Sequence, residues 1–183
     1  KGEKTNYHYV LWFKDDRTIL IKHEKYDYKL PDINNPRWIY LSSMGENSID
    51  FHDKLEKYLS EHEEIKLAFQ PGTFQMKFGK EKLNGIYKRT DILFSNKEEA
   101  QRILETEEDD IKKLLNGMAS IGPKIVVITD GVKGAYSYDG HEMLSMRLYP
   151  DPAPPLERTG AGDAFSSTFT AALALGMSVR DAM

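Results

Sequence analysis

The chain has 183 residues, which is enough for one domain with a substantial core and marginal for two. Hydrophobic residues make up 40%, charged residues 30%, and the formal net charge is −4, so neither the whole chain nor any dense Lys/Arg block offers a footprint for nucleic acid. The absence of cysteine excludes disulfides and thiolate metal sites, and no apolar run approaches the ~20 residues of a membrane span. We therefore expect a cytoplasmic protein with no nucleic-acid partner and no membrane partner.

Both ends of the sequence look interrupted. It begins Lys1-Gly2-Glu3 without an initiating Met and passes almost at once into a strand-like run. At the other end, Ser178 followed three residues later by an acidic residue is typical of a helix start, yet the sequence stops at Met183. A helix of one turn is too short to stand alone, so we expect this chain to be part of a longer protein.

Residues 1–37 are expected to form a partial β lid and its connection. The runs 7–13 and 17–22 are rich in aromatic and β-branched residues and are joined by a short polar link, which predicts a hairpin. The segment 25–37 contains two prolines and is expected to be extended. The alternating apolar residues of the first strand could cover a sugar or a base; we favour one face of a packed or dimer-forming sheet.

Residues 38–183 change to an alternation of strands and helices, as in an α/β core. Short apolar runs predict strands at 38–41, 65–69, 91–94 and 124–129. Helical spacing predicts helices at 49–61, within 76–88, at 96–104 and at 108–118. Ser48 is expected to cap the first helix, and Gly79 and Gly85 to interrupt the second.

The last of these strands is apolar on both faces, as expected in a parallel sheet that helices cover on both sides. The runs 134–138 and 143–148 flank an Asp-Gly turn and predict a second hairpin. We therefore expect an α/β fold with a Rossmann-type, doubly wound, mostly parallel sheet flanked by helices, to which the small β lid is appended.

A glycine-rich turn, Thr159-Gly160-Ala161-Gly162-Asp163, precedes a long apolar run and is expected to open a helix that ends before Gly176. The first N–H groups of a helix have no internal partner, so with the helix dipole they form a site for an anion such as phosphate. Asp163 would repel a phosphate, but it can accept the proton of a hydroxyl that attacks one. The turn therefore predicts phosphoryl transfer to an alcohol, unless Asp163 merely complements the helix dipole.

Three motifs, in order along the chain, resemble the PfkB/ribokinase family of carbohydrate and nucleoside kinases. Residues 159–165 resemble the C-terminal signature of that family. Residues 96–99, Asn-Lys-Glu-Glu, match its Asn-x-x-Glu motif, and residues 129–134 look like its nucleotide-phosphate loop. The hairpin at 7–22 is similar to the lid that covers the substrate. The resemblance implies a ribokinase-like fold for the core.

The resemblance also implies a reaction. The γ-phosphoryl group of ATP would move to a hydroxyl of a sugar or nucleoside, the small-molecule partner. Asp163 would be the catalytic base, and the backbone amides of Gly160, Ala161, Gly162 and Asp163 would form the anion hole. Lids of this kind often pair in dimers, so a homodimer through the lid is one candidate assembly, and the sequence leaves the oligomeric state open.

The two upstream motifs would hold the nucleotide. Asn96 and Glu99 would organise Mg²⁺ and the phosphates, with Glu99 acting through water, since Mg²⁺ prefers oxygen ligands and keeps several waters. Thr129, Gly131 and Gly134 would contact the phosphates and the ribose of ATP. The glycines suit a loop whose backbone must approach phosphate closely.

Local structure offers a second explanation for both motifs. Ser95 and Glu98 fit a capping box, in which case Asn96 and Glu99 would face the site. The loop at 131–134 could instead be an ordinary turn between a strand and a hairpin.

The sequence departs from the family pattern in several places. Glu157 stands where the family usually has Asp, and Arg158 where it has a small hydroxyl residue. In several relatives that Asp and the residue at the position of Thr159 help to hold a monovalent cation, so Glu157 and Thr159 are candidate K⁺ ligands. The N-terminal Gly-Gly substrate motif and the C-terminal segment that lines the adenine pocket are absent, so this chain alone is expected to be inactive.

Two other functions remain open. A non-catalytic regulator of the same fold would bind nucleotide or sugar without turnover, but such a site has no use for the base Asp163. Kinases of the same fold that act on vitamin-like alcohols generally lack a β lid, so the hairpin at 7–22 argues against that branch.

Overall fold

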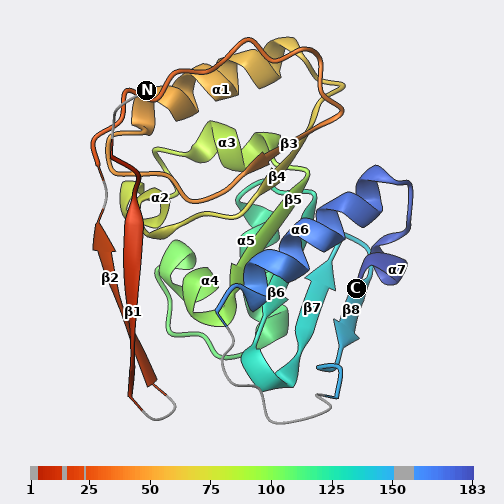
Figure 1. Ribbon diagram of the computed structural model, residues 1–183. Helices are drawn as coiled ribbons and strands as arrows, with labels where there is room; N and C mark the ends of the chain where they lie inside the picture. Colours follow the sequence, from red (N-terminus) through yellow and green to blue (C-terminus); the bar gives the residue numbers. More distant parts are fainter. Residues whose placement is uncertain (1–3, 14–15, 23, 151–158) are drawn as a thin grey trace.

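The computed structural model describes residues 4–13, 16–22, 24–150 and 159–183, which form two β-sheets and the helices around them (Figure 1). The small sheet pairs β1 (Tyr7–Phe13) with β2 (Asp16–Lys22) in antiparallel fashion. The large sheet has the order β3-β4-β5-β6-β7-β8. Its strands are β3 (Trp38–Leu41), β4 (Lys66–Phe69), β5 (Ile92–Asn96), β6 (Ile125–Thr129), β7 (Ala135–Tyr138) and β8 (Met143–Met146). The first four are parallel and the last two antiparallel, so the expectation of a mostly parallel sheet is confirmed.

Helices cover both faces of the large sheet. One face carries α1 (Ile49–Glu61), α3 (Asn84–Arg89), α4 (Lys97–Leu104) and α5 (Ile111–Ser120), with the short α2 (Thr73–Phe78) at its edge. The other face carries α6 (Ala161–Ala174) and the single turn α7 (Val179–Ala182), and α6 crosses the front of the sheet in Figure 1. This is the doubly wound arrangement that the alternation of strands and helices predicts.

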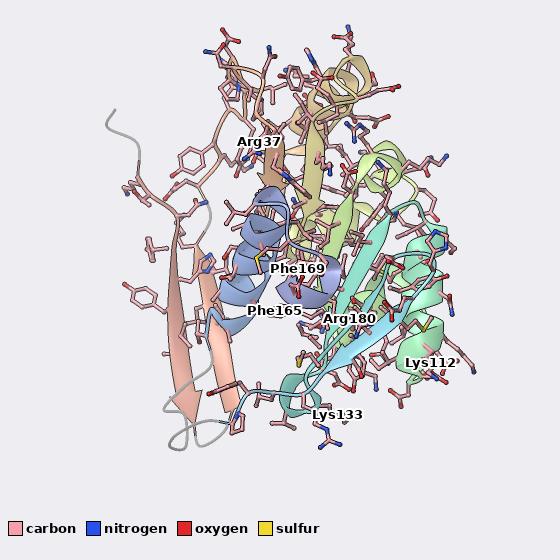
Figure 2. The ribbon with its side chains drawn as sticks, turned by 90° about the vertical axis from the view of Figure 1, so that its right-hand side faces the viewer. Arg37, Lys112, Lys133, Phe165, Phe169 and Arg180 are labelled. Carbon is pink, nitrogen blue, oxygen red and sulfur yellow. The ribbon has the colours of Figure 1, made fainter. Side chains whose placement is uncertain are left out.

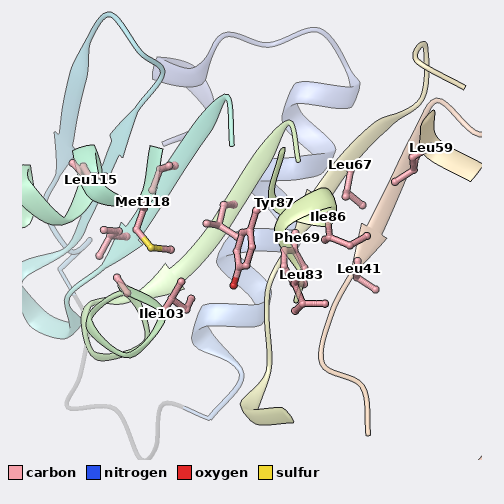
Figure 3. Packing of buried hydrophobic residues seen from close by; sticks show 14 of the residues in the cluster. Leu41, Leu59, Leu67, Phe69, Leu83, Ile86, Tyr87, Ile103, Leu115 and Met118 are labelled. Atoms are coloured by element: carbon pink, nitrogen blue, oxygen red, sulfur yellow. The ribbon is translucent and has the colours of Figure 1, made fainter. Parts of the chain in front are cut away.

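The core consists of two apolar clusters, one on each face of the sheet. Leu59, Tyr87 and Met118 belong to the larger one, which lies between the sheet and α1, α3, α4 and α5 (Figure 3). The smaller one contains Phe169, which projects from α6 as Figure 2 shows, and Phe94 of β5. The middle of β6 is fully buried on both faces, as its continuous apolar sequence predicts.

Two helix starts differ from the sequence prediction. Ser48 does precede α1, but its hydroxyl donates to the carbonyl of Gly45 at 2.7 Å instead of accepting from the helix. The helix expected from residue 108 begins at Ile111, because the carboxylate of Asp110 accepts from the N–H of Lys112 at 2.8 Å and caps it there. The acidic residues before Asp110 therefore precede the helix and are not part of its first turn.

The segment 76–88 holds parts of two helices, α2 and α3, and the two glycines in it have different roles. Gly79 ends α2 with a positive φ of 85°, so the predicted interruption is confirmed there. Gly85 does not interrupt α3, contrary to the prediction. A Cβ on Gly85 would lie 1.8 Å from the carboxylate carbon of Glu56 on α1, which is the flexible end of that side chain and would have to move aside.

The small sheet stands beside the large one, at the left of Figure 1. Tyr9 and Leu20 lie opposite each other on one of its faces and are 63% and 50% exposed, while Ile19 and Ile21 on the other face are also exposed. Both faces of the hairpin are therefore apolar and open. Within the described ranges, no helix is long and apolar enough to cross a membrane.

Candidate active site

The predicted motifs meet at the carboxyl ends of β4, β5 and β6. Because these strands are parallel neighbours, their ends lie along one edge of the sheet, and Asn96 on β5 is the register partner of Thr129 on β6. A cleft of about 940 Å³ opens at this edge and at the start of α6. It is lined by Asn96, Glu99, Thr129, Gly131, Gly134, Gly160, Ala161, Gly162 and Asp163.

The start of α6 presents to this cleft backbone donors that no other described residue engages. Gly160 is the N-cap, with φ 80° and ψ −2°, and the first helical hydrogen bond runs from the N–H of Ala164 to the carbonyl of Gly160 at 2.8 Å. The N–H groups of Ala161, Gly162 and Asp163 therefore precede the helical ladder. A Cβ on Gly160 or Gly162 would meet no atom within 4 Å, so the space above these donors is open to a ligand.

The carboxylate of Asp163 is exposed in the cleft and is held from one side by Gln70. The Gln70 Nε2 donates to Asp163 Oδ1 at 2.8 Å. The other end of the same amide, Oε1, accepts from the hydroxyl of Tyr40 and lies 2.9 Å from the hydroxyl oxygen of Ser166. The carbonyl of Gly162 lies 2.8 Å from the same hydroxyl, whose one proton goes either to that carbonyl or to Gln70. The predicted base is thus part of a network that joins β3, the end of β4 and α6.

Gln70, Tyr40 and Ser166 are site residues that the sequence motifs do not indicate. Gln70 follows a predicted strand and precedes Pro71 and Gly72, which only places it near the cleft. The three side chains come from positions 40, 70 and 166, and nothing in the spacing of the sequence connects them. Their common feature is that they meet between the sheet and α6, where Tyr40 packs on the α6 side and its hydroxyl bonds to Gln70 and Ser166.

Asn96 and Glu99 form the capping box of α4, which corrects the predicted box of Ser95 and Glu98. Asn96 Oδ1 accepts from the N–H of Glu99 at 2.8 Å, and Glu99 Oε2 accepts from the N–H of Asn96 at 2.9 Å. Ser95 is buried within β5, and Glu98 lies 4.0 Å from Arg102 on the exposed side. The cap therefore fixes Glu99 at the cleft instead of competing with a role there.

Burial raises the pKa of the Glu99 carboxyl above its ordinary value. The hydrogen bond from the N–H of Asn96 and the charge of Arg102 lower it, and the charge of Asp163 raises it further. A half-buried carboxylate that another negative charge faces is poised to bind a cation. Among the residues that the structure describes, no three His, Asp or Glu side chains form a group that could hold a metal ion.

The loop after β6 contains a 3₁₀ turn, Gly131–Lys133, which Gly134 ends. The two glycines of this loop have different surroundings. Gly131 has a φ of 51°, and a Cβ there would meet nothing within 4 Å. Gly134 has a φ of 97°, and a Cβ there would lie 2.0 Å from the carbonyl oxygen of Met146 on the neighbouring strand. Gly134 lines the cleft, but packing against β8 is what requires a glycine at this position.

The cationic side chain of this loop is paired. Lys133 Nζ lies 3.1 Å from the carboxylate of Asp130. Of the two candidate K⁺ ligands, Thr159 is exposed and directly precedes Gly160, and Glu157 lies outside the described residues. The K⁺ site therefore stays a prediction.

Comparison with known proteins agrees with this geometry. The model of the family described as pfkB family carbohydrate kinase matches residues 2–183. The chain is 28% identical over 183 residues to an ATP-dependent 6-phosphofructokinase of Thermoanaerobacterium thermosaccharolyticum, covering 96% of this chain and 52% of that protein. It is 38% identical over 99 residues to a cytidine kinase of Thermococcus kodakarensis, covering 51% of this chain and 33% of that protein. The chain thus spans about half or less of these relatives' length.

Solved structures show the same fold. A ribokinase of Arabidopsis thaliana complexed with ribose and ATP superposes with a TM-score of 0.78 at 20% identity, covering 99% of this chain and 60% of that one. A ribokinase of Cryptococcus neoformans var. grubii in complex with ADP gives 0.76 at 22% identity, covering 100% and 63%. The ribokinase-like fold expected from the sequence is confirmed. From the family match over nearly its whole length, the chain belongs to the pfkB family of carbohydrate kinases.

Proposed function

We propose that this chain carries the catalytic corner of an ATP-dependent kinase that transfers the γ-phosphoryl group to a hydroxyl of a sugar or nucleoside. In this proposal Asp163 removes the proton of the attacking hydroxyl, and the free amides at the start of α6 stabilise charge on the transferred group. The observation that carries the proposal is one juxtaposition: an exposed carboxylate sits in the same first turn whose N–H donors are open to the cleft.

The other half of the cleft would hold ATP. Thr129 and Gly131 would contact the phosphates and ribose, with Gly134 shaping the same loop. Asn96 and Glu99 offer oxygen atoms at an open edge with room for water, which suits Mg²⁺. When bound, Mg²⁺ would neutralise charge on the phosphates. The residues of this chain orient that ion and supply the base.

Residues 1–37 would act as a lid over the substrate and as a dimer contact, with 38–183 as the nucleotide-binding core. Both faces of the β1–β2 hairpin expose apolar side chains, so one face can cover a substrate while the other packs against a second copy.

Release of ADP tests the activity. We expect the complete reading frame that contains this chain to release ADP from ATP only when a suitable sugar or nucleoside is added. A panel of pentoses, hexoses, phosphorylated hexoses and nucleosides is compared with ATP alone in a coupled assay. Nucleotide binding without ADP release across this panel would contradict the proposal and favour a regulator of the same fold.

Replacement of Glu99 by Gln separates its structural role from its proposed ionic one. The Gln oxygen can still accept from the N–H of Asn96, so the capping box is kept. The negative charge is lost, so we expect the KM for MgATP to rise ~10-fold with little change in fold. The measurement is the KM for ATP as a function of Mg²⁺ concentration. Glu61→Gln at the exposed end of α1, which does not line the cleft, is the control, and equal effects of the two substitutions would contradict the assignment.

The same substitution has a pH signature. Because the folded pKa of Glu99 lies above its ordinary value, the folded state holds the proton more tightly. The contribution of Glu99 to the free energy of unfolding therefore falls as the pH rises from near 4.5 through the raised pKa. We expect Glu99→Gln to remove this fall, measured by urea unfolding at several pH values.

A further inference from the structure

We propose that Gln70 is a positioning residue for the base: its amide holds one carboxylate oxygen of Asp163 and leaves the other for the substrate hydroxyl. This inference rests on the proposed function, since it assigns a partner to the group that would remove the proton. It concerns a residue outside the three family motifs.

The period of the strands explains how Gln70 reaches α6. Trp38 and Tyr40 of β3 and Ala68 of β4 lie on the face of the sheet that α6 covers. Gln70 is two residues beyond Ala68, so its side chain falls on the same face. The N–H of Gln70 donates to the carbonyl of Leu41 at 2.9 Å, which continues the β3–β4 ladder to this residue and fixes its backbone.

The chemistry of its neighbours fixes which way the amide of Gln70 points. An ionised carboxylate can only accept a hydrogen bond, so Asp163 requires the NH₂ end. Tyr40 and Ser166 carry hydroxyl protons and can donate to the oxygen end. The reversed amide would place its oxygen against the carboxylate, acceptor to acceptor. The observed orientation is therefore the one that gives the carboxylate of Asp163 a donor and still offers an acceptor to the hydroxyls.

Support behind the amide makes it a rigid holder. Ser166 is buried and is itself tied to the carbonyl of Gly162, one residue before the base. The network thus closes on the same turn of α6 that presents the anion donors. A displacement of Gln70 would move Asp163 relative to those donors, and misplacement of a reacting group by about 1 Å can cost roughly 100-fold in rate.

The contact with Gln70 also gives the two carboxylate oxygens of Asp163 different roles. Oδ1 accepts from Gln70 at 2.8 Å. No hydrogen bond from another described residue reaches Oδ2, and the side chain is exposed in the cleft. A substrate hydroxyl above the start of α6 would therefore meet Oδ2, in a direction that Gln70 sets.

Two titratable side chains, those of Tyr40 and Glu99, lie near Asp163 in addition to the neutral amide of Gln70. Desolvation, and to a lesser degree the charge of Asp163, raises the pKa of Tyr40 on β3. Glu99 on α4 is influenced by the same charge. Neither group donates a hydrogen bond to the carboxylate of Asp163, so Gln70 is the donor that stabilises its ionised form, among the residues described.

The test uses Gln70→Leu and Gln70→Glu in the complete reading frame that contains this chain. Leu removes the donor. Glu keeps the size of the side chain and an oxygen for Tyr40 and Ser166, but places a second carboxylate beside Asp163. We expect kcat to fall roughly 10- to 100-fold in both variants, with the KM for ATP within about twofold. The acidic limb of the kcat profile should move to higher pH, further in Gln70→Glu, because the ionised base loses a donor or gains a like charge.

Gln101→Leu is the matched control. This glutamine lies on α4 and donates to the carbonyl of Glu108 at 2.8 Å, away from the cleft. Its replacement should leave kcat and the pH profile unchanged. If Asp163→Asn abolishes turnover while both Gln70 variants keep the wild-type kcat and pH profile, the positioning role is overturned and the base stands. If Asp163→Asn itself keeps turnover, the proposed function is overturned first. A Gln70 effect confined to the KM for ATP also overturns the positioning role.

Discussion

Replacement of Asp163 by Asn is expected to lower kcat at least ~100-fold and to leave the KM for ATP within about twofold. Asn has the same shape, and its side-chain oxygen can still accept from Gln70, so the geometry of the cleft is preserved. What is lost is the ability to take a proton. The lost charge at the start of α6 costs only ~0.3–1 kcal/mol of helix stability. Steady-state kinetics with the preferred acceptor, together with a thermal unfolding curve, provide the measurement.

Asp181→Asn is the matched control for this experiment. Asp181 also stands in the first turn of a helix, where its carboxylate accepts from the hydroxyl of Ser178 at 2.6 Å, but it does not line the cleft. Equal losses in the two variants would point to a general effect on helix starts. Near-normal turnover in Asp163→Asn would remove Asp163 from the role of base.

The architecture follows from local patterns, which is why the sequence predicts it well. The buried run at β6, the two hairpins and the helix behind the glycine-rich turn each depend on residues within a few positions of one another. Parallel pairing then brings the carboxyl ends of β4, β5 and β6 to one edge without further information. For this reason every predicted site residue that the structure describes, apart from Thr159, lines one cleft.

The contacts that the sequence does not predict are lateral ones. Gln70 meets Asp163 across 93 positions of the chain, and Gly85 lies against the carboxylate of Glu56 on another helix. The capping box of α4 lies one residue later than the sequence predicts, because Ser95 with Glu98 and Asn96 with Glu99 both fit the pattern. Because β5 ends at Asn96, this residue is the N-cap of α4. Its backbone N–H therefore donates to the side chain of Glu99 and not to that of Glu98. Packing between elements, rather than propensity within them, determines these features.

Replacement of Gly134 by Ala is expected to lower the free energy of unfolding by at least ~3 kcal/mol. With φ 97° and ψ −148°, Gly134 occupies a region that is essentially restricted to glycine. In addition, the new Cβ would lie 2.0 Å from the carbonyl oxygen and 3.0 Å from the carbonyl carbon of Met146. These are backbone atoms of β8, so relief requires separating β7 from β8. Urea unfolding of the two proteins gives the difference.

Gly131→Ala isolates the cost of the backbone conformation alone. Gly131 also has a positive φ, 51°, but its Cβ would meet nothing within 4 Å, so the expected loss is only ~1 kcal/mol. The larger loss at Gly134 would therefore measure the close approach of β8. If instead Gly134→Ala unfolds like the wild type and only its KM for ATP rises, nucleotide contact rather than packing would be the reason for the glycine. That outcome would also require β7 and β8 to separate at little cost in stability. The 2.0 Å approach between the new Cβ and the backbone of β8 argues against it.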